Sequence, residues 1–271
     1  MRLRLFIVLT TYLYGMTATS VIAQTCGGNC GCYDCNGNCL FDSTNGCCSI
    51  SPIIVDVSGR GFSLTTGQNG VDFDFFGNLD KIRIAWTAQG SDNAWLVLDG
   101  NQNGLIDSAK EMFGNLTPQP KSTNPNGFLA LAVFDRPEYG GNADGIIDAR
   151  DSIYSSLRLW IDKNHNGISE PGELFTLPEL DVLSISLDYK LSERVDEFGN
   201  RFRYRSTIRG MAHSRIDRVI YDVFLVAAKS TAVTASAPDL WRRGEHNAMV
   251  GKGTCPVAPV AISGRVRPVA R

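Results

Sequence analysis

Residues 162–173 read DKNHNGISEPGE, a stretch in which oxygen-bearing side chains alternate with other residues up to a glycine. A hard divalent cation such as calcium takes about six to eight oxygen ligands, so a short loop must wrap around it with alternate side chains pointing inward. Gly167 at the sixth position permits the positive φ that this reversal requires. The spacing matches a complete EF-hand calcium loop. The predicted ligands are Asp162, Asn164, Asn166, the backbone carbonyl of Ile168 and Glu173.

The same spacing occurs twice more upstream, and such repetition argues against coincidence. Residues 99–111 carry the pattern as far as the seventh position, but the twelfth is Lys110, which cannot bind a cation. Glu111 would reach the ion if the loop bulges by one residue. The predicted ligands of this loop are Asp99, Asn101, Asn103, the carbonyl of Leu105 and Glu111.

A further copy lies between these two loops and is interrupted. Gly140 stands at its first position, so we expect Asp135 to supply the missing carboxylate while residues 136–141 loop out at a modest entropic cost. The predicted ligands are Asp135, Asn142, Asp144, the carbonyl of Ile146 and Asp151. The alternative for all three stretches is a polar Asn/Gly turn that holds no ion.

The 271 residues divide into four parts. We expect a signal peptide in residues 1–23, from the basic start and apolar run, and a disordered tail in residues 230–271, whose composition shows no periodicity. Residues 24–51 hold seven of the eight cysteines, and residues 52–229 form the candidate calcium module. Export to the periplasm or the extracellular space favours disulfides in the cysteine-rich part, with a zinc site at Cys32 and Cys35 as the alternative.

Composition argues against several functional classes. The formal net charge of −2 predicts no nucleic-acid partner, and beyond the signal no apolar segment is long enough to span a membrane. The sequence contains no HExxH, GxSxG or phosphate-binding glycine motif, so we expect no enzyme. A glycosidase carboxylate pair is the weaker alternative, because most acidic residues lie in the calcium loops. A surface or extracellular protein partner stays open.

The apolar pattern predicts an α+β fold of small antiparallel sheets, short helices and EF-hand-like calcium loops, preceded by a disulfide-rich segment. Short helices are expected over residues 128–134 and 149–156. We expect Trp86, Trp95 and Trp160 in the core rather than in a sugar-binding platform, and His165 pointing to solvent. The expected strands cover residues 53–57, 71–76, 82–86, 95–98, 182–187, 202–208 and 219–227.

Several short motifs carry a family resemblance: SPIIVD at 51–56, LVLD at 96–99, EMFGN at 111–115 and LRLW at 157–160. They resemble the calcium-dependent self-processing modules of iron-regulated RTX proteins. The chain is still more similar to a group of uncharacterised exported bacterial proteins with EF-hand-like loops. The resemblance covers roughly residues 52–229 and implies an exported calcium-binding protein in which calcium is structural or induces folding.

The resemblance also implies an alternative function, calcium-triggered autoproteolysis. In that family the cleaved bond is an Asp-Pro bond at the start of the module, and the matching position here is Ser51-Pro52. The sequence contains no Asp-Pro dipeptide, and a serine hydroxyl does not replace a carboxylate that attacks its own carbonyl. Cleavage by that route is therefore disfavoured. Two further family loops, beginning at Asp56 and Asp74, lack ligands and are expected to be structural turns.

Overall fold

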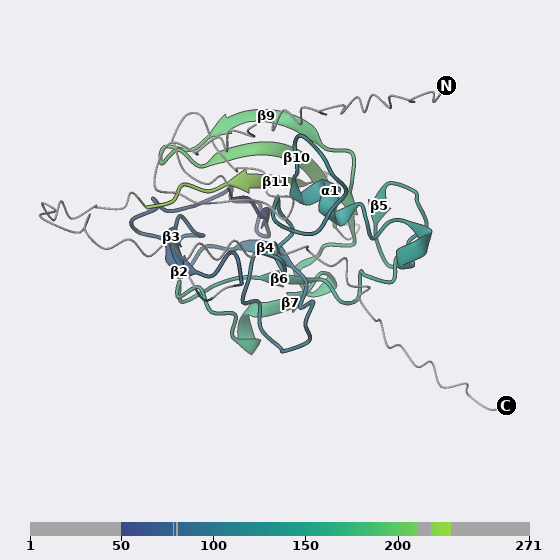
Figure 1. Ribbon diagram of the computed structural model, residues 1–271, viewed down its shortest axis with the longest axis horizontal. Helices are drawn as coiled ribbons and strands as arrows, with labels where there is room; N and C mark the ends of the chain where they lie inside the picture. The colour runs from purple at the N-terminus through teal and green to yellow at the C-terminus, as the bar shows by residue number, and fades with distance from the viewer. Residues whose placement is uncertain (1–49, 78, 80, 211–217, 229–271) are drawn as a thin grey trace, which may run out of the picture.

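The computed structural model describes residues 50–77, 79, 81–210 and 218–228 (Figure 1). The expected signal peptide, the cysteine-rich segment up to residue 49, the disulfides and the tail from residue 230 lie outside these residues. None of the helices in the described ranges has the length and hydropathy that crossing a lipid bilayer requires.

One antiparallel sheet of nine strands dominates the described part of the chain, in the order β5-β8-β10-β11-β1-β4-β6-β7, with β9 also pairing with β10. The sheet curls, so that β9 and β10 lie across one side of the molecule and β6 and β7 across the other (Figure 1). The strands are β1 (Ile53–Asp56), β4 (Asn93–Val97), β5 (Ile146–Ile147), β6 (Arg158–Trp160), β7 (Leu174–Thr176), β8 (Ser184–Ser186), β9 (Lys190–Val195), β10 (Arg201–Arg209) and β11 (Arg218–Phe224).

The remaining elements are short. β2 (Val71–Phe73) and β3 (Ile82–Ile84) form a separate hairpin, and α1 (Gly127–Leu131) is the α-helix of the described residues. Three single 3₁₀ turns are η1 (Pro137–Tyr139), η2 (Pro171–Glu173) and η3 (Pro178–Leu180).

The predicted α+β class is therefore wrong: the fold is mostly β, and one large curled sheet replaces several small ones. The expected helix over 149–156 is a series of turns, because side chains compete for the backbone there. Asp148 accepts the backbone N–H of Arg150 at 2.9 Å, and Asp151 accepts that of Asp148 at 2.8 Å. The expected helix over 128–134 is confirmed only over its first part, as α1.

The core has two halves, one on each face of the sheet, because successive side chains of a strand point to opposite faces. In β1, Ile53 and Val55 pack with Phe128 of α1, whereas Ile54 packs with Trp86 and the hairpin β2–β3. All three β1 side chains are fully buried. β1 is thus covered on both faces and paired on both edges, by β11 and β4.

The tryptophan prediction is confirmed. Trp86, Trp95 and Trp160 are fully buried. The ring centroid of Trp86 lies 5.1 Å from that of Trp95 and 5.5 Å from that of Trp160. These rings therefore form part of the core and offer no platform for a sugar.

Candidate metal centre

The loop of residues 162–173 connects β6 to β7 as a long hairpin, since the Ile161 N–H donates to the Glu173 carbonyl at 3.0 Å. Within it, the Asp162 carboxylate accepts the backbone N–H groups of Asn166 at 3.1 Å and Gly167 at 2.8 Å. The Asn164 side-chain oxygen accepts the same Asn166 N–H at 3.1 Å. Oxygens from the first and third positions thus point to one place inside the loop.

The acidic residues at the two ends of this loop are held from the hydrophobic core. Asp162 accepts the indole N–H of Trp86 at 2.8 Å. Glu173 accepts the indole N–H of Trp160 at 3.3 Å and the backbone N–H of Lys163 at 2.8 Å. Burial raises the pKa of Glu173. A carboxylate desolvated in this way is stabilised in its charged form by a nearby cation.

The loop of residues 99–111 repeats this arrangement. Asp99 accepts the N–H groups of Asn103 at 3.1 Å and Gly104 at 2.9 Å, and Asn101 also accepts that of Asn103 at 2.9 Å. Glu111 closes the loop by accepting the N–H of Gly100 at 3.1 Å, while Lys110 is exposed. Glu111 is only 5% exposed, and burial raises its pKa. The structure thus places Glu111, displaced by one residue, where the regular loop has its last ligand.

The interrupted loop also brings its predicted residues together. Asp135 accepts the N–H groups of Asp144 at 3.2 Å and Gly145 at 2.9 Å, which are the contacts made by the first residue of the other loops. The inserted residues contain η1 and return to Asp135, since a Cβ on Gly141 would lie 2.2 Å from the Asp135 carbonyl carbon. Asp151 accepts the Asn142 N–H at 3.3 Å. One feature differs: Arg150 forms an ion pair with Asp144 at 2.6 Å.

The three loops share one backbone path. The fourth residue of each, Gln102, Ala143 and His165, has a left-handed φ of 61°, 59° and 61°. Non-glycine residues rarely adopt this conformation. The sixth residue of each is a glycine with a φ of 82°, 80° and 69°, in chain order. The repeat inferred from spacing is therefore also a repeat in conformation.

In the loops at Asp56 and Asp74, which are expected to be structural turns, the first aspartate also accepts backbone N–H groups. Asp56 accepts the Gly59 N–H at 2.9 Å, and Asp74 accepts the Gly77 N–H at 2.7 Å. An aspartate that closes a turn through backbone N–H groups is therefore no evidence of an ion by itself. The candidate loops differ by their additional oxygens at the third, fifth and last positions.

Comparison with known proteins identifies the family of the chain. Residues 53–225 match the SPM domain. The chain belongs to the SPM domain family. It is also 36% identical, over 142 residues, to the iron-regulated protein FrpA of Neisseria meningitidis serogroup C. That match covers 51% of this chain but only 12% of FrpA, so the chain corresponds to a small part of that relative. The predicted resemblance to modules of iron-regulated RTX proteins is confirmed at this level.

The donor set of the SPM domain loops fits calcium. Carboxylates, side-chain amides and backbone carbonyls are the ligands of hard cations, whereas zinc sites favour nitrogen and sulfur. Among the described residues, no three His, Cys, Asp or Glu side chains gather as a metal-binding group. The predicted ligand sets combine acidic side chains with neutral amide and carbonyl oxygens, which are not counted in such a group. Among the described residues, no α-helix flanks the first or the third loop.

Two further acidic residues lie within these loops of the SPM domain. Asp107 and Glu170 stand at the ninth position of their loops and accept side-chain N–H groups of Asn103 and Asn166, both at 2.8 Å. The ninth position is a known ligand position in EF-hand loops, so the sequence carried the signal.

Other contacts at the site had no signal in the sequence. The Ile106 N–H donates to the Ser169 hydroxyl at 2.7 Å and joins the first loop to the last. The expectation that His165 faces solvent is wrong: its ring nitrogens lie 2.8 Å from the carbonyl oxygens of Thr87 and Asn69. Since the left-handed backbone at His165 turns the side chain back toward the body of the domain, this ring ties the loop to the β2–β3 region.

Proposed function

We propose that this SPM domain is a calcium-binding module of an exported, RTX-related bacterial protein, and that the ions act mainly on its folding and stability. The observation that carries the proposal is the threefold recurrence of one backbone path with one pattern of inward-facing oxygens. Calcium would supply the positive charge that offsets the buried carboxylates Glu111 and Glu173. The loop residues already hold the oxygens in place through backbone N–H groups.

The expected gain in stability on calcium binding follows from the ratio of the free calcium concentration to Kd. A ligand that binds only the native state stabilises it by RT ln(1 + [L]/Kd), about 2.7 kcal/mol at a hundredfold excess over Kd. Each loop uses amide oxygens at its third position, which lowers the ligand charge. Affinities on the order of 10⁻⁵ to 10⁻³ M, the range of extracellular modules, are therefore expected. Such a domain would be loaded after export, where calcium is abundant.

Cleavage is not part of the proposal. Ser51 is buried, its N–H donates to the Asn115 side chain at 2.9 Å, and its hydroxyl accepts the Asn115 N–H at 3.1 Å. These contacts fix Ser51 in place next to β1. Intact-mass spectrometry with calcium and with chelator checks this point, because cleavage would yield a new amino terminus at Pro52.

Isothermal titration calorimetry tests calcium binding. The chain, stripped of metal by chelator, is titrated with calcium, and we expect saturable binding. Asp162→Asn and Glu173→Gln each replace one charged ligand of the last loop by a neutral amide with little change in volume, so we expect the calcium affinity of that site to fall sharply. Asp56→Asn, at a turn without further ligands, is the matched control and is expected to bind as the wild type does.

Thermal unfolding measured in chelator shows whether each variant is folded. If the folded Asp162→Asn and Glu173→Gln variants bind calcium with unchanged stoichiometry and heat, the last loop is not a calcium site. If the wild type gives no saturable heat up to millimolar calcium, the proposed function is wrong.

A further inference from the structure

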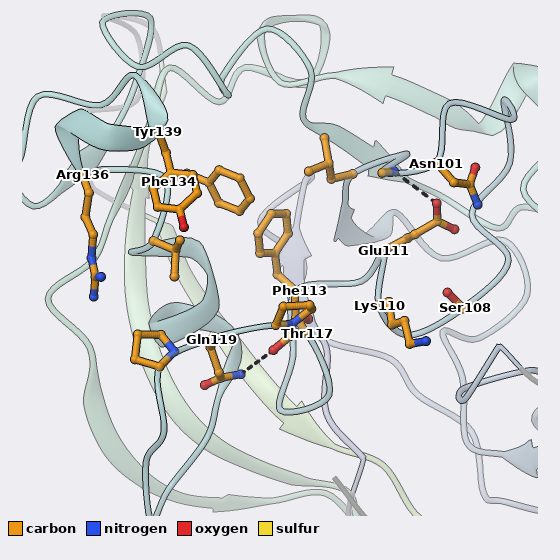
Figure 2. Close-up of a pocket in the computed structure, with 15 residues that line it drawn as sticks. Asn101, Ser108, Lys110, Glu111, Phe113, Thr117, Gln119, Phe134, Arg136 and Tyr139 are labelled. Atoms are coloured by element: carbon orange, nitrogen blue, oxygen red, sulfur yellow. Dashed lines mark hydrogen bonds between the residues drawn. The ribbon is translucent and has the colours of Figure 1, made fainter. Parts of the chain in front are cut away.

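A cavity of about 520 Å³ lies between the first two calcium loops (Figure 2). Its lining comes from three segments: the loop of residues 99–111, the chain that follows it as far as Pro120, and the stretch from Val133 to Tyr139 that enters the interrupted loop. A volume of this size is typical of sites for small organic ligands.

The cavity wall is mainly apolar and aromatic. Phe113 is fully buried beneath the cavity, whereas Val133, Phe134 and Tyr139 are half-buried and leave part of their surface on it. The ring centroid of Phe134 lies 6.0 Å from that of Phe113 and 6.0 Å from that of Tyr139. Figure 2 shows these three aromatic residues beside one another. Apolar surface of this kind binds an apolar ligand body by releasing water.

Two polar side chains of the lining, Glu111 and Gln119, are already engaged in hydrogen bonds within the domain. The Glu111 carboxylate accepts the N–H groups of Gly100 at 3.1 Å and Asp107 at 3.0 Å. The Gln119 amide donates to the Gly114 carbonyl at 3.0 Å and accepts the Asn126 N–H at 3.0 Å. These groups shape the cavity, and their hydrogen bonds do not require a ligand.

The two cationic lining residues, Lys110 and Arg136, are exposed, and neither pairs with a carboxylate among the described residues. They flank the aromatic residues from different segments (Figure 2). Both positions arise where the loops depart from the regular pattern. The one-residue bulge moves Lys110 out of the ligand position, and the insertion that begins at Arg136 also brings Tyr139.

We infer that this cavity binds a small organic anion with an apolar body and a single carboxylate. The apolar wall disfavours a polyanion, which would lose its hydration without enough partners, and the unpaired cations disfavour a cationic ligand. The body would lie against Phe134 and Tyr139 while the carboxylate meets Lys110 or Arg136. The inference does not depend on calcium occupying the loops.

Octanoate and its neutral analogue octanamide are the probes. Both are titrated by calorimetry into the full chain, once with calcium and once with chelator. We expect octanoate to bind about tenfold more tightly than octanamide, because a hydrogen bond from a cationic side chain to a carboxylate is stronger than one to a neutral amide. The double variant Lys110→Gln, Arg136→Gln is expected to lose that preference and to bind octanamide as before.

Two further variants complete the test. Val133→Trp fills the cavity and is expected to abolish binding of both probes, whereas Lys190→Gln removes an exposed lysine on β9 and should change nothing. Thermal unfolding confirms that each variant is folded. The inference is overturned if octanoate fails to bind under both conditions, if the folded Val133→Trp variant still binds it, or if the double variant keeps its preference for the anion. If calcium fails to bind in the same titrations, the comparison of octanoate with octanamide still tests the inference.

Discussion

The carboxyl group of Asp222 in β11 is fully buried and lies against the start of α1. It accepts the Gly127 N–H at 2.6 Å. Burial raises the pKa of Asp222 to about 7, although the nearby Ser51 hydroxyl and the Gly127 N–H favour the charged form. Because the native state holds this proton and the unfolded chain releases it near pH 4, stability depends on pH.

We predict that the free energy of unfolding falls as the pH rises from about 4 to about 7, with a contribution from Asp222 on the order of 4 kcal/mol. Asp222→Asn should remove this contribution while its side-chain oxygen still accepts the Gly127 N–H. Urea unfolding in chelator at several pH values measures the difference between the variant and the wild type. Asp188→Asn, at an exposed position, is the control. Equal slopes for Asp222→Asn and the wild type would contradict the prediction.

Among the short elements, the strand pair β4–β6 and the segment after β3 connect the core to the loop of residues 162–173. Trp86 donates its indole N–H to Asp162 at 2.8 Å, whereas the indole N–H of Trp95 finds no acceptor among the described residues. Both rings are fully buried in the same cluster. Trp95 is therefore a matched control for Trp86.

We predict that Trp86→Phe destabilises the domain by about 1–3 kcal/mol more than Trp95→Phe does. Both changes remove a similar volume, but only the first removes one of the hydrogen bonds that the buried Asp162 carboxylate accepts. Chemical unfolding of the two variants in chelator gives the comparison. Equal losses of stability would show that the indole contact with Asp162 contributes nothing to the fold.

The helices and strands also show which features of the fold a local sequence pattern can predict. The spacing of Asp and Asn predicted which residues meet in each loop, since those contacts span only a few residues. The consecutive apolar residues of β1 and the alternating apolar residues of β10 predicted strands. The polar sequence of β9, KLSERV, has no such alternation, because its side chains are mostly exposed.

Partners distant in sequence could not be predicted. Asp162 and Trp86 are 76 residues apart, and the pairing of β1 with β11 joins opposite ends of the described domain. Whether strands form several small sheets or one large curled sheet depends on such long-range pairs, which no local pattern encodes. The α+β prediction therefore located seven of the eleven strands in the described residues, missed β5, β6, β7 and β9, and had the assembly wrong.

At the scale of the whole molecule, β1 is the strand through which both halves of the core are held together. It pairs with β4 and β11, and its side chains enter both core clusters. β9 pairs with β10, and its side chains are mostly exposed, including Leu191 at 72% and Val195 at 54%. Opening β1 requires disruption of both clusters, whereas β9 can separate locally.

We predict that β1 amides exchange with solvent deuterium only through global unfolding and that β9 amides exchange through local opening at a much lower free energy. Hydrogen exchange followed by mass spectrometry, with calcium and with chelator, measures both. If calcium binds the native state alone, it should slow exchange in β1 by the full stabilisation, about a hundredfold at a hundredfold excess over Kd, and leave β9 nearly unchanged. Equal slowing in both strands would mean that β9 opens only with the whole domain, and the proposed division of stability would be wrong.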